Sequence, residues 1–157
     1  MGKKTGKNPT DRGKLGVKRS VLIDGRGVPL GAAVNGANVH DQTLVSETLD
    51  NIPAPRPKPT LRNPQHLCLD KGYAGEPIEK EVRRRDYTLH MPAKGNQTVK
   101  PKHRHGKARR WKVERTHSWI NRARRLLIRW EKKAANYMAF LHLQFAIITL
   151  RIVGVLG

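Results

Sequence analysis

Residues 18–34 read KRSVLIDGRGVPLGAAV, two apolar runs separated by the tetrapeptide Asp24-Gly25-Arg26-Gly27. β-Branched and aliphatic residues favour strands, and an Asp-Gly pair between two such runs is a strong signal for a tight turn. The stretch therefore predicts a β-hairpin with strands at 18–23 and 28–34. In this interpretation Asp24 is a turn residue and not a catalytic carboxylate.

The segments on either side of the hairpin differ in character. Residues 1–15 are basic, rich in glycine and aperiodic, so we expect an irregular arm, or a loop whose partner strand is not in this chain. After the hairpin, a one-sided pattern at helical spacing predicts a helix over 41–51, with Asp41 as its N-cap. The residues of that pattern are Leu44, Val45, Thr48 and Leu49.

Further along the chain, strand and helix patterns alternate. We expect an extended proline-rich linker at 53–59, a buried strand at 66–70, a helix at 76–85, a strand at 87–91, a mobile basic loop at 92–108, a long helix at 109–130 and a mostly apolar helix at 134–153. This order predicts an α/β fold in which helices flank a mixed sheet. The last helix is too short in its apolar part for a membrane span, which needs about 20 apolar residues, so we expect it to pack in the core.

The composition points to a phosphate-rich partner. The chain has 157 residues, with 32 Lys and Arg against 12 Asp and Glu, and a formal net charge of +20. A surface this basic attracts nucleic acid. The single cysteine, Cys68, excludes a disulfide framework and a zinc site built from several cysteines, and it suits a reducing cytosol. No apolar stretch follows Met1, so we expect no secretory signal.

Two carboxylates are candidates for catalysis. Asp70 ends the apolar run HLCLD, and Glu114 is the only acid between Asp86 and Glu131. Each has an ordinary alternative: Asp70 as a turn former before Lys71, and Glu114 as a surface residue paired with an arginine four residues earlier. Taken together, a carboxylate at a strand end and a second on a later helix could hold Mg²⁺, which prefers one or two carboxylates plus phosphate oxygens.

Glu114 is expected to lie outside the buried face of its helix, at 100° per residue. The predicted buried stripe consists of Val113, Trp119, Ile120, Ala123, Leu126, Leu127 and Trp130. On the rest of the helix, arginines crowd the sequence with few acids to balance them, which favours phosphate contact over a merely solvated face. These arginines are Arg122, Arg124, Arg125 and Arg129. His103 and His105 do not have a zinc spacing, and we expect them in a solvated loop.

Five segments together resemble a known family. They are GKNPTDRGKLGVKRSVLIDGRG, GANVHD, LCLDKGY, RRWKVERTHSWINRARRL and the tail YMAFLHLQFAIITLR. The chain resembles bacterial insertion-sequence transposases of the DDE type, in the groups of insertion sequences four and five. The resemblance spans nearly the whole chain, and the paired LCLDKGY and WKVERT segments are its most specific part.

The resemblance implies an RNase H-like core with Asp, Asp and Glu as ligands of Mg²⁺ or Mn²⁺. Asp70 matches the family's second Asp, Glu114 its Glu, and Arg110 the arginine four residues before that Glu. The implied activity is cleavage at the ends of an element, followed by attack of the exposed 3′-hydroxyl on target DNA, with no covalent protein intermediate. The expected partner is double-stranded DNA, bound by a homodimer in the bacterial cytoplasm, at the nucleoid. Residues expected to contact that DNA are Arg110, Lys71, Arg115, Arg122, Arg125, Lys94, Lys102, Arg104 and Lys107.

One element of the family pattern is missing. The family's first Asp lies on an opening strand that nothing in this chain matches. Asp11 belongs to a segment that follows this strand in the family, Asp24 lies in the predicted turn, and Asp41 is at the predicted helix cap. We therefore expect a basic arm at 1–15 and a partial catalytic domain at 16–157, the C-terminal part of a transposase. Such a product could come from the second frame of a frameshifted element, with an upstream-frame product supplying the first Asp, or from a remnant copy.

Two expectations follow from the missing strand. The strands at 18–23 and 66–70 would lack their shared neighbour, and the product alone would be inactive and marginally stable. An alternative function is that of a non-catalytic basic DNA-binding remnant that keeps affinity for DNA but does not cleave it.

Overall fold

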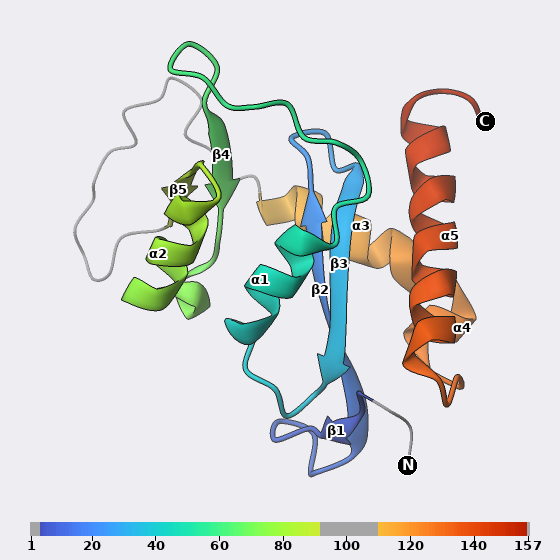
Figure 1. Ribbon diagram of the computed structural model, residues 1–157. Helices are drawn as coiled ribbons and strands as arrows, with labels where there is room; N and C mark the ends of the chain where they lie inside the picture. The colour runs from blue at the N-terminus through green and yellow to red at the C-terminus, as the bar shows by residue number, and fades with distance from the viewer. Residues whose placement is uncertain (1–3, 92–109, 157) are drawn as a thin grey trace.

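The computed structural model describes residues 4–91 and 110–156 (Figure 1). The elements in chain order are β1 (Gly6–Lys7), β2 (Leu15–Ile23), β3 (Pro29–Gly36), α1 (Thr43–Asp50), β4 (Gln65–Cys68), a 3-10 turn (Lys71–Tyr73), α2 (Glu76–Arg84), β5 (Tyr87–His90), α3 (Arg110–Asn121), α4 (Arg124–Leu127) and α5 (Ala134–Ile152). The predicted α/β class is confirmed.

The hairpin of β2 and β3 forms as predicted. Its antiparallel register runs from Val17 opposite Gly36 to Ile23 opposite Pro29. Asp24 organises the turn, because its Oδ1 accepts hydrogen bonds from the backbone N–H groups of Arg26 and Val28, each at 2.8 Å. This local side-chain-to-backbone bonding is the reason that Asp favours turns, and it confirms the structural assignment of Asp24.

The N-terminal segment differs from the irregular arm that we expected. Residues 4–14 fold back as a small hairpin, in which Gly6 lies opposite Gly16 and Lys7 opposite Leu15. The chain reverses because Arg12 and Gly13 both adopt positive φ, at 49° and 70°. A left-handed residue beside a glycine lets a short loop close without strain on the strands.

The second sheet is a parallel pair, in which β4 and β5 align from Gln65 opposite Tyr87 to Cys68 opposite His90. Parallel neighbours need a crossover, and α2 supplies it. The helix forms at the predicted place, with Pro77 in its first turn and with acidic residues before basic ones, as the helix dipole favours. The proline-rich residues that precede β4 form neither a helix nor a strand.

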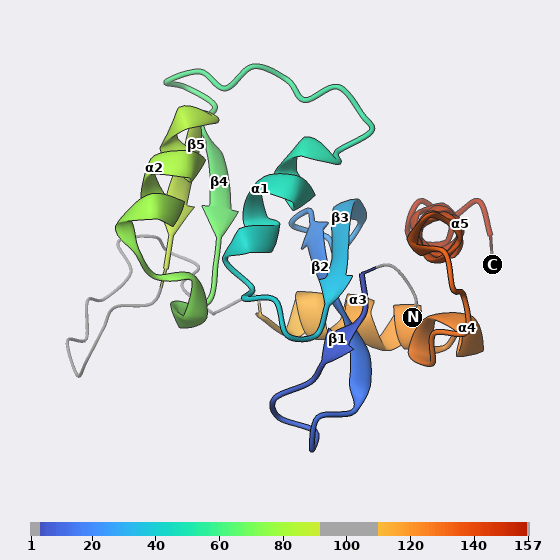
Figure 2. The ribbon, with the colours of Figure 1, turned by 60° about the horizontal axis from the view of Figure 1, so that its bottom comes forward.

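The two sheets are separate from each other in the described part of the chain. Residues 17–23 of β2 pair with β3, β4 pairs with β5, and no described strand joins β2 to β4. In both ribbon views β2, rather than β3, lies on the side of the hairpin toward β4 (Figures 1 and 2). The strands at 18–23 and 66–70 are thus not paired with each other in the described part of the chain.

Two cores correspond to the two sheets. The first lies between the β2–β3 hairpin and the C-terminal helices, and its buried residues are Ala32, Val34, Ile120, Leu126, Tyr137, Leu141, Phe145 and Ile148. The second lies between α1, α2 and the β4–β5 pair, and its buried residues are Val45, Leu49, Leu67, Ile78 and Val82. Figure 2 shows α1 on one side of the hairpin and α5 on the other.

The prediction of one long helix over 109–130 is wrong for its second half, because α3 ends at Asn121. Ala123 adopts an extended backbone before the short helix α4. The break directs the side chain of Leu126 toward the first core, and Leu126 is 2% exposed. Leu127 and Trp130, which were predicted to be buried, are 59% and 76% exposed. Tertiary contacts stabilise the break: the Tyr137 hydroxyl and the side chain of Arg19 both donate hydrogen bonds to the carbonyl oxygen of Leu126, at 3.0 and 3.2 Å.

Helix α5 forms at the predicted place and packs as a core helix. Tyr137, Leu141, Phe145 and Ile148 are its buried residues, and they recur at the spacing of one helix face. Across the described ranges of the chain, no helix is both long enough and apolar enough to span a membrane.

Candidate functional site

Asp70 lies just beyond the carboxyl end of β4, as predicted. The backbone N–H of Leu69 still donates to the carbonyl oxygen of His90 at 2.9 Å, so the strand pairing continues to the residue before it. The carbonyl oxygen of Asp70 then accepts the N–H of Tyr73 at 3.0 Å and starts the 3-10 turn. This geometry leaves Asp70 exposed at the end of β4. The prediction of a buried strand is wrong for most of β4, because Leu67 is 4% exposed but His66 and Cys68 on either side of it are exposed.

A second carboxylate, Asp41, lies near the same place, and sequence reasoning missed it. The pKa of Tyr73 is raised, first by burial and then by the negative charges of Asp41 and Asp70, so both carboxylates act on one phenol. The side-chain amide of Gln42 donates to the carbonyl oxygens of Gly72 and Ala74, at 3.2 and 3.3 Å. These bonds attach the start of α1 to the 3-10 turn that follows Asp70.

The expectation that Asp41 caps a helix is wrong. Helix α1 begins at Thr43 with Gln42 at the N-cap position and no side-chain capping bond. The Asp41 carboxylate instead forms an ion pair with the ammonium of Lys18 on β2, at 3.2 Å. Asp41 lies one residue before the N-cap position, so its carboxylate is not placed to accept the free N–H groups of the first turn.

Helix α3 is attached to the turn of the hairpin by three side chains of one face. Lys112 donates to the carbonyl oxygen of Gly25, Arg115 to that of Arg26 at 2.8 Å, and Thr116 to that of Gly27 at 2.9 Å. The spacing i, i+3, i+4 places these donors side by side on a helix. Thr116 is completely buried, so the bond to the turn is protected from water.

Glu114 lies on the face of α3 opposite to these three donors. At 100° per residue its direction is roughly 150° from the centre of the attached face. Glu114 is exposed, which confirms that it lies outside the buried stripe. Within residues 4–91 and 110–156, no three or more His, Cys, Asp and Glu side chains form a group that could hold a metal ion.

The arginines and lysines predicted to contact DNA fall into three groups. Arg115 and Arg125 are engaged within the protein: the Arg115 guanidinium lies 4.8 and 4.6 Å from the ring centroids of Trp111 and Trp119, and Arg125 pairs with Glu131 at 3.3 Å. Lys71 and Arg122 are exposed. The side chain of Arg110 and the residues Lys94, Lys102, Arg104 and Lys107 lie outside the described part of the structure, as does the whole basic loop at 92–108.

The β4–β5 pair also joins two histidines that the sequence did not single out. Nδ1 of His66 lies 2.7 Å from Nε2 of His90, and their ring centroids are 4.8 Å apart. One ring must donate and the other accept, so at least one of the two is neutral in this arrangement. The parallel register brings them together, because His66 lies opposite Thr88, two residues before His90 and on the same face of the pair.

The comparisons with known proteins agree on one family. The family model described as "Transposase DDE domain" matches residues 1–150. A protein of Burkholderia cepacia named "Putative transposase for insertion sequence element IS402" is 40% identical over 147 residues, which cover 89% of this chain and 65% of that protein. The chain therefore spans just under two thirds of the length of this relative. No solved structure matches. On the family match over most of its length, this chain belongs to the transposases with a DDE domain.

Proposed function

We propose that this chain forms part of the catalytic domain of an insertion-sequence transposase that binds DNA, cleaves its strands and transfers them. The observation that carries the proposal is the placement of two exposed carboxylates within the matched segments: Asp70 beyond the carboxyl end of β4 and Glu114 on the outer face of a firmly attached helix. The location in a bacterial cytoplasm and at the nucleoid follows from this function and remains part of the proposal.

The donor chemistry of these residues fits a divalent metal. Asp70 and Glu114 offer carboxylate oxygens, which Mg²⁺ and Mn²⁺ prefer, and both are accessible. A bound metal of this kind would activate water and neutralise the charge that develops at a phosphate. The protein's own part would be to hold the two carboxylates on rigid supports, the end of β4 and the hairpin-bound helix α3.

We also propose an RNase H-like sheet in which a further strand lies between β2 and β4. In the described residues, the β2 segment at 17–23 and strand β4 each pair along one edge, with β3 and β5 respectively. Unpaired strand edges attract another strand, and one strand here would join both sheets. Such a strand, from an upstream segment of a longer protein, would supply the family's first Asp close to Asp70.

Duplex DNA binding is tested first, because it does not require catalysis. The net charge of +20 predicts that affinity falls steeply with salt, with a log–log slope of roughly 0.9 per phosphate neutralised. Fluorescence anisotropy with a labelled duplex at a series of salt concentrations measures this slope. An affinity that hardly changes between low and moderate salt would contradict DNA binding through phosphates.

Nicking by two forms of the protein tests the proposed missing strand. We expect the 157-residue form to be inactive, and a form extended upstream in the element's frame to nick element ends in the presence of Mg²⁺ and to melt at a higher temperature. If the short form nicks robustly, the third carboxylate lies within this chain, and Asp41, whose charge acts with that of Asp70 on Tyr73, is the first candidate, ahead of Asp11 and Asp24.

Substitutions in the active extended form test the two carboxylates. We expect Asp70→Asn and Glu114→Gln each to abolish nicking while duplex affinity holds or increases, because each change removes a negative charge from a basic protein. Glu79→Gln is the matched control, since Glu79 is an acid of α2 whose side chain is 43% exposed and pairs with Arg83 of the same helix, at 3.7 Å. Normal nicking by Glu114→Gln would make Glu114 an ordinary surface residue. An extended form that binds DNA but never nicks would favour the non-catalytic remnant.

A further inference from the structure

The connection between α4 and α5 is firmly held through Arg129. Its Nε donates to the carbonyl oxygen of Glu131 at 2.8 Å, and its two terminal nitrogens donate to the carbonyl oxygens of Lys4 and Lys132 at 3.2 and 3.4 Å. Its guanidinium also lies 5.4 Å from the ring centroid of the buried Tyr137. The side chain directly before Trp130 therefore holds the backbone directly after it, at Glu131 and Lys132.

Glu131 is the second inward-facing residue of this connection. Its side chain is 6% exposed, and its carboxylate pairs with Arg125 of α4 at 3.3 Å. Trp130 lies between these two anchored neighbours and is 76% exposed. An indole held out into solvent by a rigid backbone loses little conformational freedom when it stacks on a partner.

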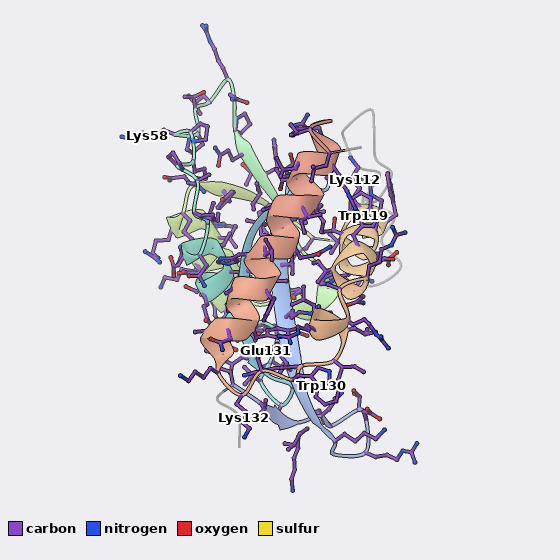
Figure 3. All side chains as sticks on the ribbon, turned by 90° about the vertical axis from the view of Figure 1, so that its right-hand side faces the viewer. Lys58, Lys112, Trp119, Trp130, Glu131 and Lys132 are labelled. Atoms are coloured by element: carbon purple, nitrogen blue, oxygen red, sulfur yellow. The ribbon has the colours of Figure 1, made fainter. Side chains whose placement is uncertain are left out.

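The surroundings of Trp130 are both apolar and cationic. Leu127 and Ile128, at 59% and 60% exposed, continue the apolar surface along the chain. Arg124, Lys132 and Lys133 are exposed nearby in sequence, and none of them has an ion pair with a described carboxylate. Figure 3 shows Trp130 and Lys132 at one end of the molecule, with Glu131 beside the start of α5.

We propose that Trp130 is a stacking platform for an unpaired base of DNA, with Arg124, Lys132 and Lys133 holding the adjoining phosphates. This Trp130 platform consists of exposed residues: Arg124, Leu127, Ile128, Trp130, Lys132 and Lys133. An aromatic ring among cations is the arrangement that recognises nucleotides freed from a duplex, because every base has a face for stacking. An apolar protein partner would have to bury three unneutralised cations, which is costly.

The inference rests on the proposed DNA function and deepens it, because it names the form of DNA that the platform selects. Strand transfer passes through DNA whose ends are frayed or branched, so unpaired bases are available at the reacting junction. The platform lies on the α4–α5 connection and not on β4 or α3, so it can be altered without touching Asp70 or Glu114.

The test compares three labelled DNAs of the same length by fluorescence anisotropy with the full chain: a perfect duplex, a duplex with one unpaired nucleotide, and a single strand. We expect Trp130→Ala to weaken binding of the two DNAs with unpaired bases by about tenfold and to leave the perfect duplex unchanged. We expect Trp130→Phe to keep most of the preference. With 2-aminopurine as the unpaired nucleotide, stacking on Trp130 should quench its emission in the wild type and not in Trp130→Ala.

Leu143→Ala is the matched control, because Leu143 is a 58% exposed residue of α5 outside the platform. Equal binding of all three DNAs by Trp130→Ala and by the wild type would overturn the platform. An equal loss of affinity for all three DNAs would also overturn it, because Trp130 would then be part of general phosphate contact. A third contrary result is loss of a dimer on gel filtration with unchanged DNA binding, which would make the surface a protein interface. Absence of any salt-dependent binding by the wild type would instead overturn the DNA function itself.

Discussion

The hairpin half of the molecule and the parallel half are built in different ways. The hairpin half consists of β2, β3 and the helices α3, α4 and α5, and its strands are joined by a turn that Asp24 closes locally. The parallel half consists of β4, β5 and α2, and its strands pair directly but are connected along the chain by the crossover helix α2. Helix α1 contacts both halves: its residues pack in the second core, and Thr48 bonds to Ser20 of β2. A two-stranded sheet is marginal alone, so the parallel half depends far more on contacts with its neighbours.

The difference also separates the two candidate carboxylates. Glu114 belongs to the hairpin half, on a helix that is fastened to the turn by three hydrogen bonds. Asp70 belongs to the parallel half, at the end of a four-residue strand. A site that needs both residues therefore depends on how firmly the two halves are joined. The strand proposed above, between β2 and β4, would join them.

The largest effect is expected from the core of the hairpin half. Leu141→Ala removes a completely buried side chain of α5 and should lower the free energy of unfolding by about 2–5 kcal/mol. Leu143→Ala on the same helix removes a 58% exposed side chain and should change it by less than about 0.5 kcal/mol. Chemical denaturation followed by circular dichroism measures both variants. Similar values for the two would show that α5 does not pack on the hairpin.

An intermediate effect is expected where the hairpin turn meets α3. Gly27 has φ of 95°, and a Cβ there would lie 2.9 Å from a terminal nitrogen of Arg115 and 3.4 Å from the hydroxyl of Thr116. Gly27→Ala should therefore destabilise the protein by about 1–3 kcal/mol. Gly72→Ala is the control, because a Cβ at Gly72 meets nothing within 4 Å. An unaffected Gly27→Ala would mean that the turn and α3 can move apart without cost.

The smallest effect is expected on the pH dependence of stability, through an acidic residue of the parallel half. Hydrogen bonds from Arg84, Arg85 and Ser46 lower the pKa of Glu81 from 4.5 to about 2. Because the folded pKa is depressed, this stabilisation is complete above pH 4.5 and is lost as the pH falls toward 2. Glu81→Gln should be less stable than the wild type at neutral pH, and the gap should close below that range. Thermal melts of both proteins at a series of pH values measure the difference in stability. A difference that stays constant with pH would contradict a lowered pKa of Glu81.

Much of the fold could be predicted because the strongest signals are local. The Asp24 turn, the helix at 76–85 with its early proline and the apolar helix from residue 134 all depend on neighbours within a few positions. The break after Asn121 could not be predicted in this way, because it is stabilised by Arg19 and Tyr137, which are distant in sequence.

The candidate site shows the same division. The patterns around Asp70 and Glu114 predicted a strand end and an exposed helix face, and both were confirmed. The closeness of Asp41 to Tyr73, and the pairing of His66 with His90, could not be predicted because each depends on the packing of one element on another. The metal ligation and the DNA contacts stay predictions.

By itself, the sequence determined the hairpin, the crossover helix, the basic character and, through its LCLDKGY and WKVERT segments, the family. Only the tertiary structure decided that Arg115 bonds to the hairpin turn at Arg26, that Asp41 pairs with Lys18, and that Trp130 is exposed rather than buried. The physical reason is the range of the interactions. Turns, caps and helix patterns act over a few residues, whereas ion pairs and core packing depend on which distant segments the fold places side by side.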